Sequence, residues 1–237
     1  MLELVTLPPA FGMRNVSPFC LKAEMLLTSL DVPFTTSEEA DPRKAPKGKL
    51  PYLIADGQTI ADSELITEYL DDITQGRVYA GLSPQQKAQG VALARLAEDH
   101  FYWIMVASRW LDDAWWPNII DGFFGIAPKL VRPLVAGMAR KQVKQTYNLQ
   151  GLGRHSLEEQ RGFAARDLQA LQDAVPDEGF LFGEAPNIFD FTIAGMMAGT
   201  LDNQPPTWVT ELARGYEKLC AYTERVQATV GVYGREL

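Results

Sequence analysis

Residues 47–63 read KGKLPYLIADGQTIADS, and this stretch decides the predicted fold. A Leu-Pro pair at 50–51 opens a short apolar run that alternates as a strand does. The Asp-Gly pair at 56–57 is a strong signal for a two-residue hairpin turn, so a second strand is expected directly after it. The Asp-Ser pair at 62–63 then precedes a helical pattern of apolar residues. The stretch therefore predicts two hairpin strands followed by a helix.

The residues before this stretch predict a parallel βαβ unit. Residues 3–7 alternate as a strand, and residues 34–37 can return as a second strand. Between them, Ser17-Pro18 predicts a helix start, because serine is a good N-cap and proline fits the first helical turn. Strand, helix and strand in this order favour parallel pairing. The βαβ unit followed by ββα is the thioredoxin arrangement, which we expect over residues 1–75.

The rest of the chain predicts an all-helical domain over residues 84–237. Residues 74–82 hold two glycines and are typical of a linker. A Ser-Pro pair at 83–84 starts a long helical pattern, which we expect to run to Trp116 and to stop at Pro117. Few β-type runs follow. The predicted fold class is α/β plus all-α, a thioredoxin-like domain followed by a helical domain.

Composition and charge exclude several kinds of function. The chain has 237 residues, a formal net charge of -8 and a sequence pI of about 4.9, so we expect no nucleic-acid partner. Cys20 and Cys220 do not make a disulfide framework, which favours a reducing, cytoplasmic location. We expect no secretory signal, because the first residues lack a basic region followed by an apolar run, and no apolar run in the sequence is long enough to span a bilayer. His100 and His155 lie outside any Cys/His cluster, so no metal site is expected.

The first stretch with chemical potential is Ser17-Pro18-Phe19-Cys20. It has the outline of a redox C-x-x-C at a helix start with serine in the leading position, which disfavours dithiol exchange. A hydroxyl at a helix N-terminus can instead donate to a bound thiolate, and the helix dipole favours the same anion. The simpler interpretation makes Ser17 a plain cap. Cys20 is either a thiol with a lowered pKa in the first turn or a small buried hydrophobe.

Two further stretches complete a candidate site. Leu50-Pro51 opens a strand, where proline is rare unless the bond before it is cis or its N–H is not needed. In a thioredoxin-like domain a cis bond here exposes backbone groups to an extended thiol peptide. Asp62-Ser63 precedes a helix, where a serine hydroxyl suits a carboxylate and the aspartate suits an ammonium. The alternative for Ser63 is again a plain helix cap.

These stretches resemble a known family. Three runs resemble the N-terminal domain of glutathione transferases: Cys20-Leu-Lys-Ala-Glu-Met-Leu-Leu, Gly48-Lys-Leu-Pro-Tyr and Ile60-Ala-Asp-Ser. The chain resembles more narrowly the failed axon connections branch, which is related to the metaxins, in four runs: Lys47-Gly-Lys-Leu-Pro-Tyr-Leu, Glu98-Asp-His-Phe-Tyr-Trp, Arg109-Trp-Leu-Asp-Asp and Gly151-Leu-Gly-Arg-His-Ser. Phe182-Gly-Glu-Ala-Pro-Asn-Ile-Phe-Asp-Phe resembles the family's C-terminal capping segment. The resemblance covers nearly the whole chain.

The resemblance implies glutathione as co-substrate and a residue for its sulfur. Ser17 would face the sulfur, with Cys20 as the alternative thiol. Leu50, through its backbone, and Pro51, in a cis bond, would hold the cysteinyl part. The loop between the first strand and Ser17 is longer than in many transferases. It could cover the site or displace Ser17 from it.

The resemblance also implies residues for the two ends of glutathione. Asp62 and Ser63 would hold the γ-glutamyl end, and Lys47 or Lys49 could meet the glycine carboxylate. Family members are usually homodimers, although this branch is less uniform. The branch includes proteins without a well-defined reaction, so the resemblance implies the fold more directly than it implies an enzyme.

An aromatic-rich helix is the candidate wall for a second substrate. Tyr102, Trp103 and Arg109 lie on the helix that walls the electrophile pocket in this fold, and Tyr102 and Arg109 share a helical face. An aromatic wall would suit a small, hydrophobic electrophile. The simpler interpretation is that most of these aromatic residues pack in the core or between domains.

Residues 118–146 form an apolar and basic segment with Asp121 as its sole acid. Such a segment could meet a membrane surface or a partner, but its prolines and glycines interrupt any long amphipathic helix, so membrane contact is disfavoured. Two rivals to a transferase follow. One is a non-catalytic binding or membrane-surface module of the same fold. The other is a reductase or peroxidase that uses the Cys20 thiol.

Overall fold

The computed structural model describes residues 1–125 and 128–236. Its N-terminal half consists of β1 (Leu2–Thr6), α1 (Pro18–Ser29), β2 (Phe34–Glu38), the 3-10 turn η1 (Pro42–Lys44), β3 (Tyr52–Ala55), β4 (Gln58–Ala61) and α2 (Ser63–Ile73). The strand order is β2-β1-β3-β4, with β1 parallel to β2 and the other pairs antiparallel. This mixed sheet confirms the predicted thioredoxin-like arrangement.

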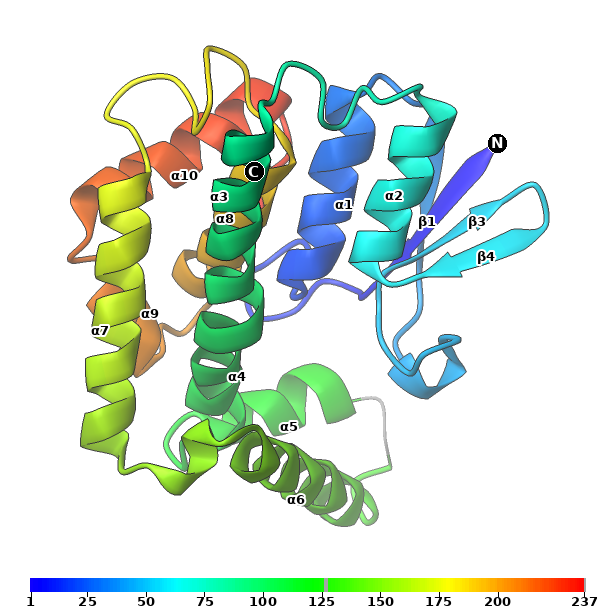
Figure 1. Ribbon diagram of the computed structural model, residues 1–237. Helices are drawn as coiled ribbons and strands as arrows, with labels where there is room; N and C mark the ends of the chain where they lie inside the picture. The colour runs from blue at the N-terminus through cyan, green and yellow to red at the C-terminus, as the bar shows by residue number, and fades with distance from the viewer. Residues whose placement is uncertain (126–127, 237) are drawn as a thin grey trace.

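The C-terminal half is helical, as predicted (Figure 1). Its helices are α3 (Pro84–Arg95), α4 (Tyr102–Trp110), α5 (Trp116–Phe124), α6 (Arg132–Gln150), α7 (Leu157–Ala174), α8 (Ile188–Leu201), α9 (Trp208–Ala213) and α10 (Glu217–Val230). A π-helical turn, η2 (Leu96–Phe101), joins α3 to α4, and a 3-10 turn, η3 (Leu152–Arg154), precedes α7. None of the helices in the described ranges is both long and apolar enough to cross a membrane.

The single long helix predicted from residue 84 to Trp116 is wrong at its far end. The helical column ends at Trp110, and α5 begins at Trp116 with Pro117 in its first turn. Between them, the Asp112 side chain accepts a hydrogen bond from the amide of Ala114 and holds a turn. Proline therefore starts a helix here, as its fixed φ and missing N–H allow in a first turn.

The two halves pack through α1 and α8. Residues of α8 from Ile188 to Thr200 are buried without interruption, so this helix is the centre of the core. A Cβ at Gly195 would lie 2.9 Å from the carbonyl oxygen of Pro18, so only glycine lets α8 approach the start of α1 this closely. The N-terminal tip of α1 is therefore pressed against the helical half.

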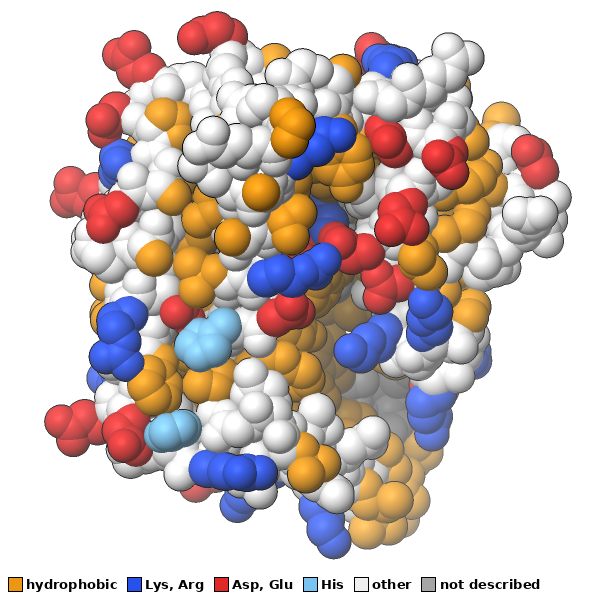
Figure 2. Space-filling model, in the orientation of Figure 1, with side chains coloured by type: hydrophobic (Ala, Val, Ile, Leu, Met, Phe, Trp, Pro, Cys, Tyr) orange, Lys and Arg blue, Asp and Glu red, His pale blue; other side chains and the backbone are white. Residues whose placement is uncertain are grey.

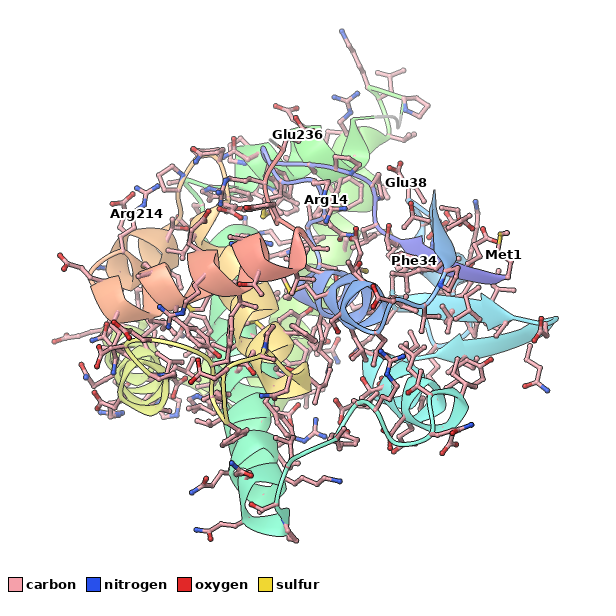
Figure 3. The ribbon with its side chains drawn as sticks, turned by 90° about the horizontal axis from the view of Figure 1, so that it is seen from above. Met1, Arg14, Phe34, Glu38, Arg214 and Glu236 are labelled. Atoms are coloured by element: carbon pink, nitrogen blue, oxygen red, sulfur yellow. The ribbon has the colours of Figure 1, made fainter. Side chains whose placement is uncertain are left out.

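The loop before α1, residues 8–16, is tied to the end of the chain. The amide of Arg14 donates to the carbonyl of Gly234 (2.8 Å), and its Nε donates to the carbonyl of Tyr233 (3.1 Å). Figure 3 shows Arg14 lying next to the chain end at Glu236. Phe11 packs edge-on against Trp115 and Phe123, with ring centroids 5.0 and 4.9 Å apart. The loop folds onto the helical half and leaves Ser17 at the helix start.

Candidate functional site

The sequence-predicted binding residues come from three elements that meet at one edge of the sheet. Ser17 caps α1. Pairing of β1 with β3 places Val5 opposite Tyr52, so the end of β1 lies beside the Leu50-Pro51 bond. Asp62 follows β4, and its amide lies 3.5 Å from the carbonyl oxygen of Pro51. The fold thus brings together residues that are 45 positions apart in the chain.

Ser17 is buried at the tip of α1, and its hydroxyl contacts only Cys20 among the described residues. Its Oγ accepts a hydrogen bond from the amide of Cys20 (3.3 Å), and its own amide donates to Oδ1 of Asn15 (3.0 Å). Pro18 has no N–H, and the Phe19 amide has no partner among the described residues. Asn15 was not predicted, because nothing in the local sequence distinguishes it from a loop residue. An anion at this tip would meet a hydroxyl, an amide and the helix dipole.

Cys20 lies in a small apolar cluster rather than at the surface. Its side chain is fully buried with Val5, Ala45 and Leu50. Burial raises the pKa of the Cys20 thiol to about 11, in spite of hydrogen bonds such as the one from Ser17. The thiol is therefore protonated at neutral pH, and this environment is opposite to that of a reactive cysteine. Of the two interpretations of Cys20, the buried hydrophobe fits the structure.

The Leu50-Pro51 peptide bond is cis, as the resemblance implies. Leu50 precedes β3, and neither its amide nor its carbonyl is hydrogen-bonded within residues 1–125 and 128–236. These two groups can pair with an extended peptide in the manner of a short added strand. Leu50 itself packs its side chain against Cys20 in the same cluster.

Asp62 and Ser63 stand at the N-terminus of α2. Asp62 has a φ of 104°, which is strained for a residue with a side chain, and its carboxylate accepts the amide of Glu64 (2.9 Å). Non-glycine residues in such conformations concentrate at functional sites. Ser63 is buried, and its hydroxyl makes no hydrogen bond in the part of the chain that the structure describes. That hydroxyl and the helix N-terminus are available to a carboxylate.

Figure 2 shows a hollow between the sheet half and helices α4 to α6, with Lys and Arg side chains on its sheet-side rim. Lys47 and Lys49 are exposed, and neither forms an ion pair among the described residues. A separate cavity of about 350 Å³ lies at the opposite end of α1, where Ser29 and Leu30 face the linker and the loop before α8. It contains none of the predicted site residues.

Tyr102 and Trp103 lie where α4 passes the tip of α1. The Tyr102 ring packs edge-on against Phe19 (4.9 Å) and against Trp103 (5.5 Å). Burial raises the pKa of Tyr102, although the charge of Arg109 acts in the opposite direction. The Tyr102 hydroxyl donates to no described residue. Both aromatic residues are half-buried, which is the exposure expected of a pocket wall.

Arg109 does not line that wall, although the sequence places it on the same helical face as Tyr102. Its side chain is only 5% exposed. The guanidinium donates to the carbonyl of Gly199 on α8 and approaches the carbonyl of Val16 (3.5 Å) and the sulfur of Met13 (3.8 Å). The seven-residue spacing predicts the face correctly, but the loop before α1 covers this part of it.

Sequence reasoning missed a buried charge cluster behind Ser63. The Nζ of Lys22 on α1 lies 2.9 Å from Glu64 and 2.8 Å from Glu98. Arg95 also bonds Glu64 (2.6 Å) and approaches Glu98 (3.6 Å). Burial alone would raise the pKa of Glu64, but Lys22 and Arg95 together lower it. The sequence does show a lysine, Lys22, among the apolar residues of this helix. That lysine indicates a buried ion pair only once it is known that other elements pack on both sides of α1.

No group of three or more histidine, cysteine or carboxylate side chains in the described ranges is arranged to hold a metal ion. The unpaired backbone groups of Leu50 and the hydroxyls of Ser17 and Ser63 are groups that can bind an extended peptide with charged ends. Free backbone groups lie at the centre of this edge of the sheet, and hydroxyls stand at two helix N-termini.

Two family models match the chain. The glutathione S-transferase N-terminal domain matches residues 18–115, and the glutathione S-transferase C-terminal domain matches residues 164–226. The two matches together span both halves of the fold described above.

The chain is also similar in sequence to two proteins of known identity. The chain is 33% identical over 240 residues to isoprene-epoxide–glutathione S-transferase from Rhodococcus sp. (strain AD45), covering 96% of this chain and 98% of that protein. It is 27% identical over 189 residues to Failed axon connections from Drosophila melanogaster, covering 74% of this chain and 44% of that protein. The match therefore spans less than half of the Drosophila protein.

Solved structures share the fold at lower identity. A glutathione S-transferase from Methylobacterium radiotolerans, solved in complex with glutathione sulfonate, superposes with a TM-score of 0.63 at 15% identity, covering 100% of this chain and 97% of that one. The beta-etherase LigF from Sphingobium sp. strain SYK-6 gives 0.61 at 17% identity, covering 96% and 95%. At such identities the likeness concerns the fold alone.

Proposed function

The chain belongs to the glutathione S-transferase family, and from that premise we propose that it binds glutathione at the tip of α1 and transfers it to a small hydrophobic electrophile. The observation that carries the proposal is the convergence of Ser17, Leu50 and Ser63 at one edge of the sheet. Leu50 and Ser63 present polar groups that are free within the described residues, and Ser17 presents its hydroxyl. An extended γ-glutamyl-cysteinyl-glycine chain matches their order.

In this proposal each part of glutathione has a partner. The sulfur accepts the Ser17 hydroxyl, and the cysteinyl backbone pairs with the amide and carbonyl of Leu50 beside Pro51. The γ-glutamyl carboxylate takes the Ser63 hydroxyl at the start of α2, and Asp62 takes the ammonium. Lys49 meets the glycine carboxylate. Ser17 stabilises the thiolate by hydrogen bonding to the charged form, which lowers the thiol pKa toward neutral pH.

The reaction follows from an available thiolate. Its sulfur attacks an electrophilic carbon, a bond from that carbon to a leaving atom breaks, and the leaving atom takes a proton. Epoxides are the first class to test, because the Rhodococcus relative is named for an isoprene epoxide. Opening an epoxide leaves an alkoxide, and in this proposal the Tyr102 hydroxyl donates a proton to it. Tyr102 and Trp103 supply the apolar surface for the hydrocarbon part.

The test compares two serines on the same helix. We expect wild-type protein to bind glutathione and to lower the pKa of its thiol, as followed by the ultraviolet absorbance of the thiolate during a pH titration. Ser17→Ala should bind glutathione but lose most of that lowering, and with it about 10²-fold or more in conjugation rate. Ser29→Ala, at the other end of α1, should behave as wild type. Binding without any change of thiol pKa in wild type and Ser17→Ala alike would refute this function.

The oligomeric state and compartment belong to the same proposal. We infer a homodimer in the cytoplasm, as the family resemblance and the two unpaired cysteines suggest. Analytical ultracentrifugation of the full chain decides the first point. A monomer at micromolar concentration that still conjugates glutathione would contradict the dimer.

A second candidate function rests on the surface of α6 and of the residues just before it. Leu130, Leu134 and Met138 are 96%, 67% and 66% exposed, and Lys141 and Lys144 follow them. Ile126, which the sequence places in the same segment, lies outside the described residues. A non-catalytic module would use such a surface to meet a partner or an anionic membrane. Protein that ignores immobilised glutathione but floats with anionic vesicles would support this alternative over transfer.

A further inference from the structure

Arg109 carries a positive charge that no acidic residue compensates. Its guanidinium contacts the Gly199 carbonyl, the Val16 carbonyl and the Met13 sulfur, all of them neutral. Within residues 1–125 and 128–236 no carboxylate forms an ion pair with it. Burial lowers the pKa of Arg109 to about 10, so the group stays charged at neutral pH. A buried charge without a partner lowers the free energy of unfolding, so such a residue is a candidate for a functional role.

The charge lies directly behind the tip of α1. Val16, whose carbonyl it approaches, is the residue before Ser17. Gly199, whose carbonyl it bonds, lies against Pro18, since a Cβ at Gly199 would be 3.7 Å from the Pro18 side chain. The guanidinium therefore joins α4, α8 and the loop before α1 at the point where that helix begins.

We propose that Arg109 is a positioning residue whose buried charge holds the sulfur of bound glutathione in its ionised form at the tip of α1. The inference rests on the proposed function and adds a source of thiolate stabilisation that does not touch the ligand. Arg109 acts in two ways. It fixes the backbone of Val16, and hence the orientation of Ser17, and its charge adds to the positive end of the α1 dipole. The anion missing from its surroundings is the glutathione thiolate itself.

The other titratable groups around this point are neutral or already paired. Cys20 on α1 and Tyr102 on α4 both have raised pKa values because of burial, so neither carries a charge at neutral pH. Glu24 on α1 is paired with Arg14 of the loop (2.8 Å). On the α8 side, Asp202 lies 3.8 Å from Arg235 of the chain end.

The size of the effect follows from Coulomb's law. At a separation on the order of 10 Å, a unit charge in an effective dielectric constant of about 20 shifts the ionisation of a thiol by about one pH unit. That is comparable to the contribution of a single hydrogen bond from Ser17. Removing the charge should therefore cost about tenfold in thiolate at neutral pH.

The first pair of variants is Arg109→Met and Arg109→Lys. We expect the pKa of the bound thiol to rise by about one pH unit in Arg109→Met and to stay near the wild-type value in Arg109→Lys. Glutathione affinity should be unchanged at a pH well below the thiol pKa, where the bound thiol is neutral in both proteins. A purely structural role would weaken binding and lower the melting temperature without moving the titration. A folded Arg109→Met that binds glutathione with an unchanged thiol pKa overturns the proposal.

The second pair keeps Arg109 and gives it a partner. Met13 lies 3.8 Å from its Nη2, so Met13→Glu supplies an acid, and Met13→Gln has the same shape without the charge. We expect the pKa of the bound thiol to be about one pH unit higher in Met13→Glu than in Met13→Gln. Equal titrations in the two overturn the proposal even if Arg109→Met does not fold. Wild-type protein that leaves the thiol at its free value overturns the proposed function as well, so the two failures are distinguishable.

Discussion

Ser17 and Cys20 lie one helical turn apart and yet differ in every property that catalysis needs. The Ser17 hydroxyl has a hydrogen to donate at the tip of α1, whereas the Cys20 sulfur is buried with Val5 and Leu50. Burial holds the pKa of the Cys20 thiol at about 11, and its folded-state value therefore lies above that of a free cysteine. A thiol of this kind packs like a small hydrophobe.

The residue-scale prediction for Cys20 is that it does not take part in the reaction. Cys20→Ala should conjugate glutathione at the wild-type rate, with a loss of about 1 kcal/mol in the free energy of unfolding because a buried sulfur is deleted. The checks are a steady-state assay and urea unfolding. A glutathione-dependent reduction that disappears in Cys20→Ser would instead show that this thiol is the redox centre.

The residue-scale prediction for Ser63 concerns affinity rather than rate. Ser63→Ala removes a hydrogen bond to a charged carboxylate, which contributes about 1.5 to 3 kcal/mol, so the KM for glutathione should rise about 10- to 100-fold. The kcat should change little, because the γ-glutamyl end does not react. Thr74→Ala, at the far end of α2, is the matched control. A fall in kcat with an unchanged KM would show that Ser63 acts elsewhere.

Residues whose role is local could be predicted from the sequence, and those whose role depends on distant partners could not. Ser17 and Ser63 are signalled by the helix starts beside them, and Pro51 by its place before a hairpin. Arg109 was placed on the correct helical face, but the loop that buries it comes from 93 positions earlier in the chain. The groups that Arg109 contacts are neutral, so the pattern of charged residues in the sequence does not predict these contacts.

At the scale of elements, the charge cluster around Lys22 links α1, α2 and the π-helical turn η2. Lys22 is 2% exposed and contacts Glu64, next to Ser63, as well as Glu98. Interruption of a helix by a π turn is frequent at functional positions. Here the turn carries Glu98 into contact with α1 and so joins the two halves of the fold.

Lys22→Met should destabilise the protein by about 3 kcal/mol, because Glu98 would stay buried without its main cation. The second variant, Lys22→Met with Glu98→Leu, should recover most of that loss, since an apolar pair of similar volume needs no compensation. Urea unfolding of both variants measures this. If the single variant is as stable as wild type, the cluster contributes nothing to the packing of the two halves.

Helix boundaries show the limit of pattern-based prediction. The capping signals at Ser17 and Ser83 are local and correct, because a side chain and its own helix start make the bond. The break between Trp110 and Trp116 was missed because apolar spacing continues across it. The turn there is held by Asp112, a short-range contact that the apolar pattern does not contain.

At the scale of the whole molecule, the end of the chain holds the loop that precedes Ser17. The contacts of Arg14 with Tyr233 and Gly234 span more than 200 positions, and Asp202, after α8, lies within 3.8 Å of Arg235. Burial raises the pKa of Asp202 to about 6, although Arg235 acts in the opposite direction. No local pattern predicts such a junction, because its two sides are a loop and a terminal segment without regular structure.

The raised pKa of Asp202 makes the stability of this junction depend on pH. A carboxyl whose folded-state pKa exceeds its unfolded value stabilises the fold below about pH 4, and that contribution is lost as the pH rises through about 6. Asp202→Asn removes the titration. Relative to wild type, its free energy of unfolding should therefore improve by on the order of 3 kcal/mol between about pH 4 and pH 8. Parallel stability profiles for the two proteins would show that Asp202 titrates normally.

A crystal structure of the protein with bound glutathione measures most directly whether Ser17 receives the sulfur. We expect the sulfur within about 3.5 Å of the Ser17 Oγ, the cysteinyl backbone paired with Leu50, and the γ-glutamyl carboxylate on the Ser63 hydroxyl. Glutathione bound at another place, or with its sulfur out of reach of Ser17, would contradict the proposed mechanism and leave only the family and the fold.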